Sequence, residues 1–252
     1  MKTNLIIFIG SVASGKTSVA RTLKNIILSK GFTAKYVNIN INHGFAYITT
    51  RLLNALLRYT YVGNHYLTIR FNNKVLFCKY LGIMLLLDVI YMPVKYVTSL
   101  KVFIMSSKFM DQRRVILLDE HYLNAIVDYL YFSQRLCKQG YEQSSYIKNL
   151  YRVFYAIAYH LFLRTIKNGE TLIIYMDRLP RHSISGWLCR EKTKVVDVNH
   201  IIFRRVATRV ILRTLKQQNN INVSIKEHFV QDFYKTLRSI IREVLTFIGE
   251  AF

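Results

Sequence analysis

Short apolar runs recur along the chain and predict its strands. The clearest runs cover residues 5–9, 115–118 and 171–176, and more mixed runs cover 33–39 and 221–225. A continuous apolar run of this length is typical of a strand that is buried on both faces of a parallel sheet. The pattern therefore predicts five strands.

Apolar residues at helical spacing lie between these runs. After Gly15 they fit a helix that ends at Lys30 and Gly31, a basic last turn followed by a glycine. A strand, a tight turn, a helix and a second strand form a βαβ unit, which implies a parallel sheet. The sequence predicts one α/β domain over residues 1–252, with a mostly helical insertion at 45–110.

Two helices near the C-terminus are predicted with a defined buried face. The helix that starts at His200 is expected to turn these residues inward: Ile202, Val206 and Val210. Its other side is interpreted as a solvated basic face, with contact to phosphate or nucleic acid as the alternative, and carries Arg205, Arg209 and Arg213. The final helix is expected to bury a stripe of Phe229, Phe233, Leu237, Ile240, Val244 and Ile248.

The composition excludes disordered, fibrous and disulfide-stabilised classes. Hydrophobic residues make up 52% of the chain and charged residues 20%, with 10 glycines and 2 prolines. The 3 cysteines form neither a disulfide framework nor a CxxC pair, so a reducing, cytoplasmic compartment is expected. No membrane span is expected, because Asp88, Pro93 and two lysines interrupt the most apolar stretch, 80–105.

Positive charge dominates the chain and is unevenly distributed. Lysine and arginine number 36 against 14 acidic residues, which gives a net charge of +22, and no acidic residue precedes Asp88. Such a surface attracts partners that carry phosphate, namely nucleotides, nucleic acid or anionic lipid.

Residues 10–17, Gly-Ser-Val-Ala-Ser-Gly-Lys-Thr, match the phosphate-loop pattern G-x-x-x-x-G-K-[ST] at every fixed position. Such a loop lets backbone amides converge on phosphate oxygens, and the following helix adds partial positive charge. Lys16 is expected to reach the β- and γ-phosphates of ATP, and the Thr17 hydroxyl to ligate Mg²⁺. The expected nucleotide-binding residues are Gly10, Ser14, Gly15, Lys16, Thr17 and Ser18.

The strand at 115–118 ends in two adjacent acids, Asp119 and Glu120. In phosphate-loop proteins an acid at such a strand end holds Mg²⁺ or accepts a proton, and Mg²⁺ requires hard oxygen ligands. Asp119 is the expected metal partner and a catalytic candidate. Glu120 is expected either to orient a nucleophile or to face solvent.

A basic, lid-like segment covers residues 178–200, after the strand at 171–176. Guanidinium groups that close on the γ-phosphate stabilise the charge that spreads over its oxygens during transfer. Arg190 ranks first for this catalytic role, followed by Arg181 and Arg178.

The order of these motifs resembles the thymidylate kinase-like branch of the P-loop nucleoside and nucleotide kinases. The matching segments are the loop, Leu118-Asp-Glu-His-Tyr122 and Ile174-Tyr-Met-Asp-Arg-Leu-Pro180. The resemblance implies a three-layer P-loop fold with a five-stranded parallel sheet, and Mg²⁺-dependent phosphoryl transfer from ATP to a nucleoside monophosphate. It places Lys16 and Thr17 at the triphosphate, Asp119 near the metal and acceptor, and Arg190 in the lid.

Two departures from this family leave the acceptor open. Glu120 stands where the family has an arginine that holds the acceptor phosphate, and residues 38–44 lack its Arg-Glu-Pro-Gly-Gly pattern. The pair Asp119-Glu120 also suits a P-loop ATPase or a nucleotide-dependent switch without kinase activity. Binding to nucleic acid or anionic surfaces, and a homodimer, stay open as further expectations.

Overall fold

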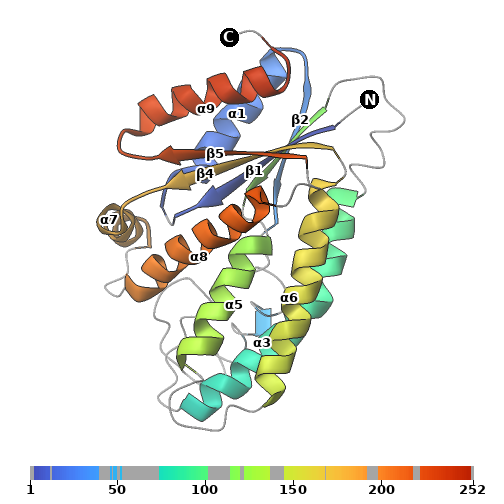
Figure 1. Ribbon diagram of the computed structural model, residues 1–252, viewed down its shortest axis with the longest axis vertical. Coiled ribbons are helices and arrows are strands. Elements are labelled where there is room, and N and C mark those ends of the chain that lie inside the picture. Colours follow the sequence, from blue (N-terminus) through green and yellow to red (C-terminus); the bar gives the residue numbers. More distant parts are fainter. Residues whose placement is uncertain are drawn as a thin grey trace.

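The computed structural model describes most of the chain (Figure 1). The described residues are 3–11, 13–39, 46, 48–49, 52, 74–101, 114–119, 122–136, 145–167, 169–191, 198–217 and 222–250. Glu120 and much of the predicted insertion at 45–110 lie outside them.

Five parallel strands form one sheet in the order β2-β3-β1-β4-β5. The strands are β1 (Thr3–Gly10), β2 (Thr33–Asn38), β3 (Arg114–Asp119), β4 (Glu170–Asp177) and β5 (Val223–Phe229). This confirms the predicted parallel sheet, although β5 begins and ends later than the expected run at 221–225. Phe229 consequently belongs to β5 and is exposed, so its predicted place in the buried stripe of the last helix is wrong.

Helices cover both faces of the sheet and complete the predicted three-layer α/β architecture (Figure 1). One face carries α1 (Lys16–Ser29) and α9 (Phe233–Phe247). The other face carries α3 (Lys74–Tyr96) with its π-helical extension η3 (Val97–Lys101), α5 (Tyr122–Leu136), α6 (Ser145–Ile166) and α8 (Val198–Lys216). The lid-like segment contains α7 (Pro180–Glu191), which follows the carboxyl end of β4.

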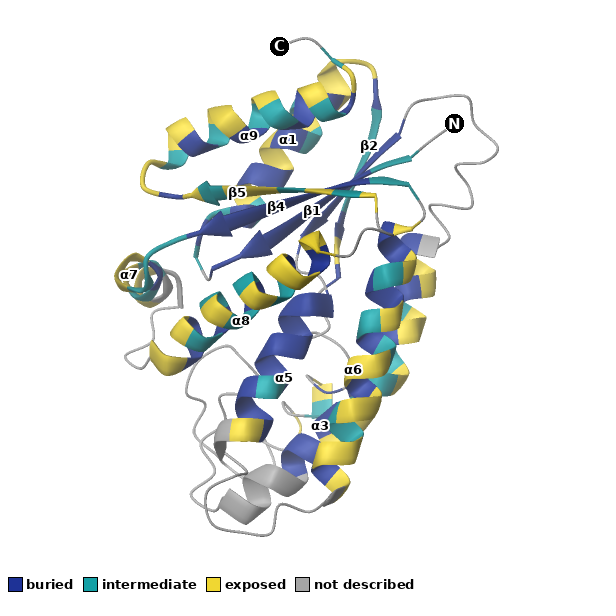
Figure 2. Cartoon of the chain, in the orientation of Figure 1, coloured by how far each residue is buried: buried dark blue, intermediate teal, exposed yellow. Residues whose placement is uncertain are grey.

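Side chains of the central strands alternate between two separate cores, and Figure 2 shows these strands buried. Ile6, Leu117 and Ile174 belong to the core under α1 and α9. Residues one position further along, such as Ile7 and Leu118, belong to the core shared with α3, α5 and α6. The continuous apolar runs in the sequence follow from this double burial.

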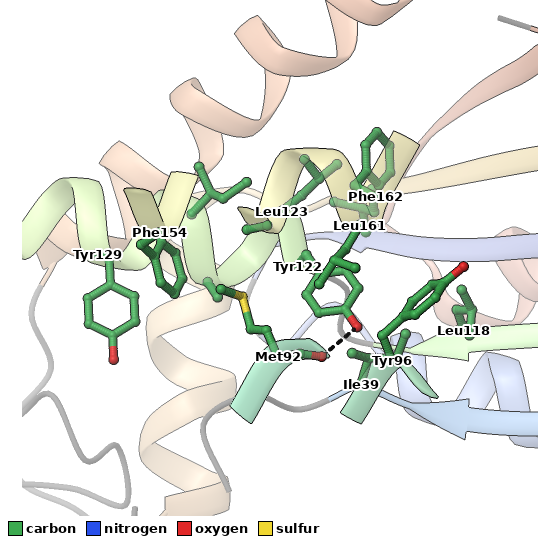
Figure 3. Close-up of a cluster of buried hydrophobic side chains, with 14 of the residues drawn as sticks. Ile39, Met92, Tyr96, Leu118, Tyr122, Leu123, Tyr129, Phe154, Leu161 and Phe162 are labelled. Atoms are coloured by element: carbon green, nitrogen blue, oxygen red, sulfur yellow. Dashed lines mark hydrogen bonds between the residues drawn. The ribbon is translucent and has the colours of Figure 1, made fainter. Parts of the chain in front are cut away.

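The second core joins the helical layer to the sheet around Tyr122, at the start of α5 (Figure 3). Its hydroxyl donates a hydrogen bond of 3.5 Å to the Met92 carbonyl of α3. Burial raises the pKa of Tyr122, with a further contribution from its tyrosine neighbours Tyr96 and Tyr91. The predicted helical insertion is therefore helical in its described part and belongs to the main core.

The predicted orientation of α8 is wrong. Ile202, Val206 and Val210 are 43%, 56% and 56% exposed. The buried face carries His200, Ile201, Arg204, Thr208, Leu212 and Leu215. Polar residues can face inward here because Asp128 of α5 forms a hydrogen bond of 2.9 Å with His200 Nε2 and lies 3.6 Å from Arg204 Nη1.

Residues Tyr80–Leu100 are, by length and composition alone, apolar enough to cross a membrane. A core helix passes the same test, and this one packs against α5 and α6. In its centre Asp88 is fully buried and accepts a hydrogen bond from the Tyr129 hydroxyl of α5. A buried carboxylate bonded to a neighbouring helix is typical of a protein core.

Replacing Tyr129 by phenylalanine tests this internal contact. The variant removes a donor from a fully buried carboxylate, so we expect a loss of about 1–3 kcal/mol in the free energy of unfolding. Urea denaturation measures it, with Tyr146→Phe as the control at a tyrosine that is 58% exposed. Equal unfolding free energies of the two variants would contradict the assigned contact.

Candidate active site

The carboxyl ends of β1 and β3 define the position of the site. These neighbouring strands are followed by helices on opposite faces of the sheet, α1 and α5 (Figure 1). In open parallel sheets, ligands bind in the crevice that opens outside the carboxyl ends of two such strands. The phosphate-loop sequence and Asp119 both lie at this point.

The loop between β1 and α1 has the backbone geometry that its glycines predict. Gly10 has a φ of +148°, and a β-carbon there would lie 2.1 Å from the Met176 carbonyl oxygen. The next amide, Ser11 N–H, donates to that same oxygen at 3.0 Å. Gly15 has a φ of +86° and lies against the ring of Phe233. The start of the loop is thereby fixed to β4, and its end to α9.

Lys16 folds back onto the loop that precedes it. Its ammonium group donates to the carbonyl oxygens of Ser11, at 2.7 Å, and Gly10, at 3.3 Å, and to Ser14 Oγ at 3.4 Å. The side chain is buried, although it carries a charge. The structure thus places the predicted residues Gly10 and Ser14 in contact with the Lys16 ammonium, and their role in nucleotide binding stays a prediction.

Asp119 lies directly beside the first turn of α1. Its Oδ2 accepts a hydrogen bond of 2.6 Å from the Thr17 hydroxyl and one of 2.9 Å from the Tyr36 hydroxyl of β2. The residue is fully buried, and its Oδ1 has no hydrogen-bond partner among the described residues. A buried carboxylate oxygen without a donor is costly, so this atom is suited to a metal ion or its bound water.

Asp177, at the end of β4, is bound by two arginines of α8. Arg205 donates Nε to Oδ1 at 2.7 Å and Nη2 to Oδ2 at 2.8 Å, and Arg209 donates to Oδ2 at 2.6 Å. Ser11 Oγ of the loop also donates to Oδ1, at 3.2 Å. Burial raises the pKa of Asp177, but hydrogen bonds and charge from the arginines outweigh it, and the net pKa is lowered. Arg205 and Arg209 are therefore ion-paired, and not a merely solvated face.

The arginines of the lid-like segment occupy different surroundings. Arg178 donates from Nη1 to the Ala13 carbonyl of the loop at 2.6 Å. Arg181 is exposed at the start of α7. Arg190 lies in α7, but its side chain is outside the described part, so its catalytic role stays a prediction. Ser18, an expected nucleotide contact, is exposed on α1.

Four residues of this site were not assigned to it from the sequence: Ser11, Tyr36, Arg205 and Arg209. Ser11 occupies a variable position of the loop pattern, so no signal marks it. Tyr36 reaches Asp119 because it pairs with Leu117, two residues earlier on the same face of β3. The i, i+4 spacing of Arg205 and Arg209 was visible, but not their acidic partner on another element.

Asp119→Asn tests whether the carboxylate is retained for a ligand and not for stability. A buried polar atom without a hydrogen-bond partner lowers stability less when it belongs to a neutral amide than when it belongs to a charged carboxylate. Without nucleotide or metal, we expect the variant to be as stable as the wild type or about 1 kcal/mol more stable in urea denaturation. A loss above about 1 kcal/mol would show that Asp119 stabilises the free protein.

Asp177→Asn tests the arginine cluster. At pH 7 we expect a loss of about 2 kcal/mol, because two partly exposed arginines lose their shared carboxylate. The lowered pKa means that this stabilisation is present above the ordinary pKa of aspartate and is lost as pH falls through the lower, folded value. The difference in unfolding free energy between wild type and variant should therefore decrease progressively below about pH 4. A difference that is constant down to pH 2 would contradict the ion pairs.

Comparisons with known proteins give a fold-level likeness only. No family model matches the sequence, and no curated protein matches it either. A solved thymidylate kinase from Candida albicans is similar in structure at 13% sequence identity, with a TM-score of 0.49. The match covers 98% of this chain and 93% of that chain.

Proposed function

We propose that the chain is a phosphotransferase that binds ATP at residues 10–17 and transfers its γ-phosphoryl group to a small acceptor. The observation that carries this proposal is the Asp119 carboxylate, held 2.6 Å from the Thr17 hydroxyl, with its other oxygen buried and without a hydrogen-bond partner among the described residues. Hydroxyl and carboxylate oxygens suit Mg²⁺, which accompanies ATP in such loops.

Phosphate binding is proposed to use groups that the loop already presents. The first turn of α1 carries no acidic residue, so the partial positive charge at the start of this helix would attract an anion. The Lys16 ammonium would exchange the neutral Ser11 carbonyl for phosphate oxygens, and a hydrogen bond between two charged groups is stronger. Binding at Lys16 therefore needs little more than a change of hydrogen-bond acceptor.

Thr17 and Asp119 are the residues proposed to hold Mg²⁺, the first directly and the second through bound water. The ion would neutralise charge on the β- and γ-phosphates during transfer. Tyr36 is proposed to keep Asp119 in place, because it donates to the same oxygen as Thr17 and leaves Oδ1 available.

The acceptor class is proposed from the motif order, with a nucleoside monophosphate as the first candidate, as in thymidylate kinases. An oxygen of the acceptor phosphate would attack the γ-phosphorus while the bond to the β–γ bridging oxygen breaks, giving ADP and a nucleoside diphosphate. The helix α5 borders the same edge of the sheet, because it begins at Tyr122, shortly after Asp119, and α3 packs against α5.

An acceptor panel separates this proposal from the alternative of an ATPase or a switch. The purified full chain is incubated with labelled ATP, Mg²⁺ and a series of monophosphates, nucleosides and phosphosugars. Label in an acceptor supports a kinase, and free phosphate without transfer supports an ATPase. If ATP binds but neither product forms, both the kinase and the ATPase are contradicted.

Lys16→Ala tests the phosphate site itself. The variant removes a charge that would contact the β- and γ-phosphates, so we expect ATP affinity to fall at least tenfold, or about 1.4 kcal/mol. Calorimetry with ATP and Mg²⁺ measures this, and circular dichroism checks the fold. Lys24→Ala, two turns further along α1, is the matched control and should bind ATP like the wild type. Equal affinities of the two variants would exclude Lys16 from the site.

A further inference from the structure

We infer that Arg178 binds the γ-phosphate of ATP at the loop, an inference that rests on the proposed function. Arg178 directly follows β4 and is therefore placed by the sheet itself. Its backbone N–H donates to Ser11 Oγ at 3.1 Å, and the same hydroxyl donates to Asp177 at 3.2 Å. Residues 177 and 178 are thereby tied to the start of the phosphate loop.

The side chain of Arg178 extends along the loop to its middle. Nη1 donates to the Ala13 carbonyl oxygen at 2.6 Å, and the residue is half-buried. Ala13 has a φ of +55°, a left-handed conformation that is unusual for a residue other than glycine. The guanidinium thus lies at the bend of the loop, two residues before Gly15.

The charge of Arg178 is not neutralised by the neighbouring acid. Asp177 is saturated by Arg205 and Arg209 of α8 and by the Ser11 hydroxyl. Within the described part of the chain, Arg178 forms no ion pair and donates its side-chain hydrogen bond to a neutral carbonyl. Lys16 has the corresponding arrangement, because its ammonium also lies on loop carbonyls.

The helix α7 confines the guanidinium on one side. A β-carbon at Gly186 would lie 2.9 Å from the Ala13 β-carbon and 3.2 Å from Arg178 Nη1. The close approach leaves no room for the side chain to turn toward α7. The guanidinium can instead exchange the Ala13 carbonyl for a phosphate oxygen, which requires only a small movement. The new hydrogen bond would be stronger, because both groups are charged. Arg178 is thus better placed than the exposed Arg181 to contact the nucleotide.

The ratio of ATP affinity to ADP affinity tests this inference. A residue that only shapes the loop would weaken both nucleotides alike, whereas a contact with the γ-phosphate affects ATP alone. Calorimetry with Mg²⁺ is performed on the wild type, Arg178→Gln, Arg178→Lys and the matched control Arg181→Gln. We expect the ratio to fall about tenfold in Arg178→Gln, to recover in part in Arg178→Lys, and to stay unchanged in Arg181→Gln.

The possible results separate this inference from the proposed function. An unchanged ATP-to-ADP ratio in Arg178→Gln overturns the role of Arg178, whether or not both affinities fall. If Arg178→Gln does not fold, Arg178→Met removes the charge in the same way, and an unchanged ratio in that variant decides against the inference. A wild-type chain that binds neither nucleotide overturns the proposed function itself.

Discussion

The alternation of side chains along parallel strands decides where the charges of this site lie. Asp119 follows Leu117 on the face of β3 that is covered by α1, so its carboxylate meets Thr17 at the start of that helix. Asp177 follows Tyr175 on the opposite face of β4, where α8 supplies its arginines. Two acids at the same edge of one sheet thereby have different roles. Asp119 presents an oxygen that has no partner in the described part of the chain, and Asp177 ties the loop to α8.

The loop itself is held in shape before any phosphate arrives. Gly10 admits the Met176 carbonyl, and Ser11 is bonded to β4 through both its amide and its hydroxyl. The cations of Lys16 and Arg178 lie on loop carbonyls, which are weaker acceptors than phosphate oxygens. Preorganisation of this kind lowers the cost of binding, because few groups need to be ordered when the anion enters.

Much of this arrangement could be predicted from the sequence. Long apolar runs reveal strands buried on both faces, and the fixed positions of the loop pattern reveal the glycine-rich turn between β1 and α1, because both signals are local. The orientation of α8 could not be predicted, since its buried face contains His200 and Arg204, whose partner Asp128 lies on α5. Tyr36 was missed for the same reason: its role depends on the register of β2 against β3. Sequence periodicity identifies apolar faces well and polar buried faces poorly, because the latter depend on partners distant in the chain.

A crystal structure with Mg²⁺ and a non-hydrolysable ATP analogue tests the central claim most directly. The account predicts that the triphosphate lies on the loop amides, that the Lys16 ammonium leaves the Ser11 carbonyl for a phosphate oxygen, and that a metal-bound water lies at Asp119 Oδ1. The account would be contradicted by a crystal grown with excess nucleotide in which Lys16 still donates to the Ser11 carbonyl and the nucleotide is bound elsewhere or is absent.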